Sequence, residues 1–145
     1  MKLLKRILPL IIALTVVFSF SLVGCGGGSN ATQFEVTVTY ADGSAVNGLT
    51  DGNAGVSADG TSAGTEIRVQ FCKIENGELG ACSTPATLGA DGKYSVNIAD
   101  LESAFGAGDY EVHLIGVKDG YTYDAKKVVN AKNAKVTLVI TEVTE

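Results

Sequence analysis

Apolar and polar residues alternate along most of the chain after residue 32. On one face of the run at 33–40 lie four apolar side chains: Phe34, Val36, Val38 and Tyr40. Polar residues occupy the positions between them. Five further runs of this kind follow, at 66–74, 93–98, 110–117, 121–129 and 135–143. A period of two with many β-branched residues is typical of strands that bury one face. The pattern therefore predicts an all-β domain.

Turn signals separate these runs. The dipeptide Asp-Gly occurs at five places: 42–43, 51–52, 59–60, 91–92 and 119–120. Glycine adopts positive φ without steric cost and aspartate tolerates the left-handed region, so each pair predicts a turn. The segment 41–64 is poor in apolar residues and predicts a long loop, with a short edge strand near Leu49 or Val56 as an alternative. Short strands joined by such turns indicate a single β-sandwich.

One short segment, 100–105, departs from the strand pattern and predicts a helix. Asp100 is of a type that caps helix N-termini, and Gly106 is of a type that ends helices. The domain is therefore expected to contain one helix among its strands.

The first 25 residues follow a different pattern. Three basic residues lie within the first six positions, an apolar stretch covers 7–23, and Gly24 precedes Cys25. This arrangement resembles the signal peptide and lipobox of a bacterial lipoprotein, the lipobox being Leu22-Val23-Gly24-Cys25. The resemblance implies cleavage before Cys25 and acylation of its sulfur. Two alternatives are an uncleaved membrane helix, for which the stretch is at the lower limit of length, and a simple secretory signal without an A-x-A-like site.

This interpretation divides the chain into a signal peptide at 1–24, a lipidated Cys25 with a Gly/Ser tether at 25–32, and a β-sandwich domain at 33–145. It anchors the protein in the bacterial membrane through lipid, outside the cytoplasm, and all three readings of the N-terminus place the domain there. The chain carries 11 Lys and Arg against 16 Asp and Glu. Without the three basic residues of the signal, 8 remain against 16, a net charge of −8. Such an acidic domain is not expected to bind nucleic acid.

Cys72 and Cys82 are the two cysteines that lipidation leaves over. In an oxidising compartment an even number of cysteines predicts a disulfide, with two free thiols on adjacent strands as the alternative. His113 is the single histidine. A zinc site would need further ligands, so we expect no metal and no cofactor.

Three motifs, in this order, resemble one group of families. They are ADGSAVNG at 41–48, ADGKYSV at 90–96, and GDYEVHL at 108–114 followed by VKDGYT at 117–122. They are similar to motifs of transthyretin-like and carboxypeptidase-regulatory-like domains, and the last is shared with the B-type repeats of collagen-binding adhesins. The resemblance implies a prealbumin-like Greek-key sandwich of about seven strands that serves as a stalk, spacer or binding module.

Residues that could carry chemistry are few. His113 alternates with Val112 and Leu114, so it is expected to lie on the opposite face of its strand, and no catalytic triad can be assembled around it. Calcium could bind oxygen ligands of Asp51, Asn53 and Asp59, or these residues could be solvated turns. Tyr121 and Tyr123 share one strand face and could stack on a sugar if exposed, or pack in the core. We therefore expect no enzyme activity.

Two functions are compatible with these features. The first is a non-enzymatic, membrane-anchored surface lipoprotein whose sandwich is a structural or protein-interaction module, similar to adhesion domains. The alternative is a lipoprotein that binds a glycan or small molecule through the 41–64 loop or the face of Tyr121 and Tyr123. The partner is then a surface protein or a glycan, besides the bilayer that holds Cys25.

Overall fold

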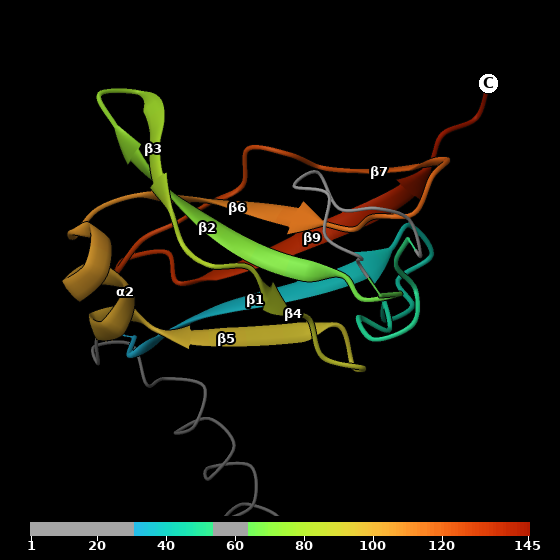
Figure 1. Ribbon diagram of the computed structural model, residues 1–145, viewed down its shortest axis with the longest axis horizontal. Helices are drawn as coiled ribbons and strands as arrows, with labels where there is room; N and C mark the ends of the chain where they lie inside the picture. The colour runs from blue at the N-terminus through green and yellow to red at the C-terminus, as the bar shows by residue number, and fades with distance from the viewer. Residues whose placement is uncertain (1–30, 54–63) are drawn as a thin grey trace, which may run out of the picture. The chain divides into compact units, whose positions relative to one another are not determined.

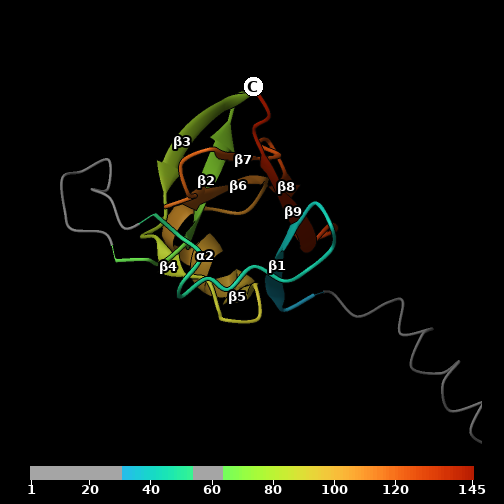
Figure 2. The ribbon, with the colours of Figure 1, turned by 90° about the vertical axis from the view of Figure 1, so that its right-hand side faces the viewer.

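Two β-sheets pack face to face in the computed structural model, which describes residues 31–53 and 64–145 (Figures 1 and 2). The first sheet has the order β5 (Lys93–Asn97), β1 (Gln33–Tyr40), β9 (Lys135–Glu142) and β7 (Tyr121–Tyr123). The second has the order β3 (Glu78–Cys82), β2 (Arg68–Glu75), β6 (Tyr110–Ile115) and β8 (Val128–Val129), and β4 (Ala86–Thr87) pairs with β2. The prediction of an all-β sandwich is confirmed.

Alternating side chains from both sheets form the core. β1 pairs parallel with β9 and antiparallel with β5, and its residues Phe34, Val36 and Val38 are buried. From the second sheet, Val69 and Val112 are buried against them. Burying one such side chain contributes about 1.5–3 kcal/mol, so the space between the sheets is the main source of stability.

The helix begins earlier than the sequence predicts. α2 spans Ile98–Phe105, and its N-cap is Asn97, whose side-chain oxygen accepts hydrogen bonds from the N–H groups of Ala99 and Asp100. The assignment of Asp100 as the N-cap is therefore wrong, because burial of Ile98 starts the helix directly after β5. The prediction that Gly106 ends the helix is confirmed, because it is the C-cap after Phe105 and has a φ of 92°.

The run at 121–129 is not one strand. It is divided into β7, which pairs with β9 in the first sheet, and β8, which pairs with β6 in the second. Between them Lys126 has a φ of 67°, and the side chain of Asp124 accepts a hydrogen bond from the N–H of Val139 at 2.6 Å. The chain crosses from one sheet to the other here, which interrupts the strand.

The loop after β1 lies at the end of the sandwich opposite α2 (Figure 1). Its described part returns to the strands through two bridges, Ala45 with Thr39 and Gly52 with Val117. Leu49, expected near an edge strand, lies in a turn and is 46% exposed. Val56 lies outside the described residues.

Two of the Ala-Asp-Gly turns offer a matched test of packing. Gly43 and Gly92 both have positive φ, at 86° and 74°. A Cβ at Gly43 would meet nothing within 4 Å, whereas one at Gly92 would lie 2.5 Å from the carbonyl oxygen of Val38. The same Ala-Asp-Gly tripeptide therefore has open space around its glycine at one site and close backbone contacts at the other.

We predict that Gly43→Ala lowers the free energy of unfolding by about 1–2 kcal/mol, the cost of positive φ alone. Gly92→Ala should lower it by about 3 kcal/mol or more, because the backbone near Val38 must also move. Urea unfolding followed by circular dichroism measures both values. Equal losses for the two variants would contradict the close packing of Gly92.

Candidate functional site

The hairpin of β2 and β3 extends beyond the end of β6 (Figure 1). Its two-residue turn is Asn76-Gly77, with φ values of 53° and 80°. Positive φ at both positions is the geometry whose twist matches that of two antiparallel strands, and Asn-Gly is the dipeptide that favours it. Neither this dipeptide nor β3 is among the elements predicted from the alternating pattern.

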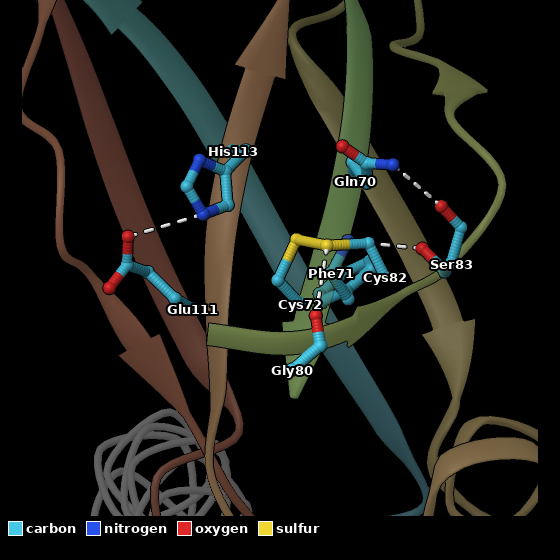
Figure 3. Close-up of a disulfide and its surroundings, with 8 residues drawn as sticks. All are labelled: Gln70, Phe71, Cys72, Gly80, Cys82, Ser83, Glu111 and His113. Atoms are coloured by element: carbon cyan, nitrogen blue, oxygen red, sulfur yellow. Dashed lines mark hydrogen bonds and ion pairs between the residues drawn. A yellow bond between two sulfur atoms is a disulfide. The ribbon is translucent and has the colours of Figure 1, made fainter. Parts of the chain in front are cut away.

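A disulfide joins the two strands of the hairpin (Figure 3). Cys72 and Cys82 lie directly opposite each other on the two strands, and the predicted disulfide between them is confirmed. Cys72 is only 3% exposed, whereas Cys82 is exposed. Ser83 adds two contacts: its hydroxyl accepts from the N–H of Phe71 at 3.0 Å, and its carbonyl accepts from the side-chain amide of Gln70 at 2.9 Å. A cross-link over such a loop stabilises by about 3 kcal/mol in the chain-entropy account.

The outer part of the hairpin presents two different faces. Ile74 lies opposite Leu79, and Glu75 lies opposite Glu78. Successive side chains of a strand point to opposite faces, so one face is apolar and the other acidic. Leu79 is 51% exposed, and every residue of β3 is exposed. We call these four residues, with the outer edge of β3, the hairpin surface.

Sequence reasoning placed a possible ligand site at Tyr121 and Tyr123. Both side chains are half-buried and pack against the core, as the alternative to sugar stacking predicts. They do not form an exposed aromatic pair. Tyr121 nevertheless borders a cavity of about 70 Å³. The cavity is lined by Tyr40, Asp51, Val117, Lys118, Tyr121 and Ile140.

Tyr40 and Asp51 form the polar side of this cavity. The hydroxyl of Tyr40 donates to a carboxylate oxygen of Asp51 at 2.9 Å, and the N–H of Asn47 donates to the same oxygen at 2.8 Å. The rings of Tyr40 and Tyr121 meet edge to face, with centroids 6.4 Å apart. Burial, and then the hydrogen bond and charge of Asp51, raise the pKa of Tyr40 to about 12.

The three residues considered for calcium are used differently. Asp51 holds the loop as described, and the side-chain amide of Asn53 donates to Asp119 at 3.4 Å. Asp59 lies outside the described residues. Within the part of the chain that the structure describes, no three His, Cys, Asp or Glu side chains are grouped to hold a metal ion.

His113 lies opposite Gln70 on the second sheet (Figure 3). Its neighbours Val112 and Leu114 are buried in the core, so His113 is on the outer face. Its Nε2 atom is 3.1 Å from Oε1 of Glu111, an ion-pair distance when the ring is protonated, but without the direction of a hydrogen bond. Cys72 of β2 lies opposite Glu111 of β6, and the sulfur of Cys72 is bonded in the disulfide. The imidazole of His113 therefore lies beside the carboxylate of Glu111, and the neighbouring Cys72 offers no free thiol.

A second, larger hollow of about 410 Å³ is open to the outside of the first sheet. Its floor is made by the cross-strand pairs Glu35–Ser95 and Thr37–Lys93. The ring of Tyr94 at its border packs on Phe71 in the core. The hollow thus offers short hydroxyls, the two carboxylates of Glu35 and Asp91 and the ammonium of Lys93.

Comparison with models of known protein families, with curated proteins and with solved structures finds no match in any of the three. Cys25 lies outside the described residues. Among the helices that are described, none has the length and apolar character needed to cross a membrane.

The raised pKa of Tyr40 predicts a pH dependence of stability. In the unfolded chain the phenol ionises near 10.0, and in the folded chain at about 12. The unfolded state therefore loses the proton first, and stability present below pH 10 is lost as the pH rises toward 12. Asp51→Asn should lower the pKa of Tyr40 only part of the way, because burial is the larger cause.

Ring NMR signals followed against pH measure this pKa, and Tyr40→Phe identifies the signal by its loss. A Tyr40 signal that titrates at the ordinary value in the folded protein would contradict both the burial of Tyr40 and its contact with Asp51.

Proposed function

We propose that this chain is a bacterial surface lipoprotein, anchored outside the cytoplasm by acylated Cys25, whose β-sandwich binds a partner protein without catalysing a reaction. The lipobox at 22–25 supports the anchor. The disulfide between Cys72 and Cys82 supports an oxidising compartment, because such bonds are rare in the cytosol.

We infer that the sandwich is of the prealbumin-like Greek-key type. The chain passes from β1 to the second sheet, back to β5, then to β6 in the second sheet, β7 in the first and β8 in the second, and it ends beside β1 in the parallel strand β9. The last strand returns beside the first, as the fourth strand of a Greek key does, but here the two strands run parallel. The order of the three sequence motifs supports the same group of domains.

The hairpin surface is the observation that carries the interaction function. It combines an exposed apolar side chain, Leu79, with a strand edge that no other described strand pairs with, on a hairpin fastened by a disulfide. Exposed strand edges are commonly covered or shortened in isolated proteins, because they pair with other chains. An exposed, cross-linked edge is therefore suited to a partner protein.

The second candidate is a small polar ligand at the cavity of Tyr40 and Tyr121. The specific observation is that Asp51 and Lys118 bring an acceptor and a donor to two aromatic rings. A volume of about 70 Å³ is well below that of ordinary ligand pockets, about 300–1,000 Å³. The protein-interaction function is therefore the better supported of the two.

We predict that Cys25→Ser abolishes acylation and leaves either an unprocessed precursor or released protein, because serine provides no sulfur for the lipid. Cell fractionation and labelling with a radioactive fatty acid measure both effects, with Ser29→Ala as the control in the tether. Unchanged labelling and membrane retention of the Cys25 variant would refute the anchor.

A second experiment tests the binding surface by photo-crosslinking on intact cells. Three exposed apolar residues are comparable sites for a benzophenone amino acid: Leu79 at 51%, Leu49 at 46% and Val143 at 54% exposure. We predict a protein cross-link from position 79 and none from 143. A cross-link from 49 alone would favour the loop and overturn the assignment to the hairpin.

A further inference from the structure

We propose that β3 is a docking strand for an extended segment of a partner protein that carries alternating basic and apolar side chains. The inference rests on the proposed function and names the partner's chemistry. Addition of a strand to an exposed sheet edge is a recurring mode of peptide recognition, in which backbone hydrogen bonds give affinity and alternate side chains give specificity.

The backbone of β3 is oriented for this pairing. The N–H of Ile74 donates to the carbonyl of Asp109, toward β6 and away from β3. Leu79 lies opposite Ile74, so this is a non-hydrogen-bonded pair, and the N–H and carbonyl of Leu79 face the free edge. These two groups are the first anchor for an added strand.

The other long edge strand is less available. At β5 the N–H of Lys93 donates to the side chain of Asp91, and its carbonyl accepts from Gly89. These contacts occupy one end of that edge. β7 has three residues and β8 has two. Among the described strands, β3 thus offers the longest free edge.

The two faces of the hairpin surface determine the side chains of the segment. A strand added to β3 alternates between the face of Ile74 and Leu79 and the face of Glu75 and Glu78. The first face requires apolar side chains, and the second favours Lys or Arg. The expected segment therefore alternates basic and apolar residues.

The charges also exclude a second copy of the chain as the occupant. Glu75 and Glu78 are directly opposite, and like charges in such pairs destabilise a hairpin. The nearest cation on β2, Lys73, has its ammonium 5.6 Å from the centre of the Tyr110 ring. In the described part of the chain neither glutamate has an ion-pair partner. Two copies meeting at β3 would bring four such carboxylates together.

The test uses the purified full chain in a non-ionic detergent at physiological salt. The probe is a fluorescent peptide of about nine residues alternating Lys and Val, a length that matches one strand and its flanks. Fluorescence anisotropy measures its Kd. Two reference peptides alternate Glu and Val, or keep Lys and Val but carry N-methyl groups on every second backbone nitrogen.

We expect the Lys-Val peptide to bind and both reference peptides to bind at least about fivefold more weakly, because one lacks the charge and the other the backbone donors. Glu75→Gln with Glu78→Gln should raise the Kd at least about fivefold. Glu142→Gln with Glu145→Gln removes the same charge elsewhere and should leave the Kd unchanged.

Two further variants test the strand itself. Leu79→Pro removes the outward N–H, and proline is tolerated on the solvent side of edge strands, so folding should persist while binding is lost. Cys72→Ser with Cys82→Ser should weaken binding, because the hairpin loses its cross-link. Circular dichroism confirms that each variant is folded. Proline and serine variants that bind as the parent does would overturn the proposal.

Four other outcomes would also overturn it. Equal binding of the N-methylated peptide, or equal weakening by the control pair of glutamines, would show attraction to overall charge alone. A dimer cross-linked through position 79 would make the occupant a second copy. If position 79 captures a cell-surface protein while no Lys-Val peptide binds, the partner class is wrong and the proposed function stands.

Discussion

Contact between three aromatic rings holds the two sheets together, and much of the remaining structure depends on it. Phe34 of the first sheet packs against Phe71 and Tyr110 of the second, with ring centroids 6.2 and 5.9 Å apart. All three are essentially buried. The hydroxyl of Tyr110 donates to the carbonyl of Gly106, which fastens the end of α2 to the same core. Because neighbours in a strand point to opposite faces, burial of Tyr110 turns Glu111 outward.

Strand positions could be read from the sequence wherever one face is buried. The run at 33–40 coincides with β1, because its apolar residues enter the core at every second position. The same alternation does not indicate to which of the two sheets a strand belongs. The run at 121–129 therefore looked continuous although the chain changes sheets near Lys126. The N-cap of the helix was predicted wrongly for a related reason. Packing of Ile98 in the core, a tertiary effect, decides between Asn97 and Asp100 as the N-cap.

The candidate site was harder to predict than the fold. β3 has no buried face, so its residues carry no hydrophobic period, and only the turn dipeptide Asn76-Gly77 indicates the hairpin. The disulfide, in contrast, could be predicted from the expected oxidising compartment and the even number of remaining cysteines. The contact of Tyr40 with Asp51 joins a strand end to a loop through space, and neither spacing nor composition encodes it. Local patterns predict elements, whereas contacts between elements require the fold.

The hairpin surface breaks local rules that the core obeys. Inside the sandwich, apolar side chains meet apolar partners, and among the described residues no polar or charged residue is buried. At the hairpin tip two glutamates face each other, and an apolar Leu79 is exposed beside them. Places where a sequence departs from stability rules without compensation are expected at functional sites. The same carboxylates repel copies of this acidic domain, so they protect an edge that would otherwise self-associate and leave it open to a strand of opposite charge.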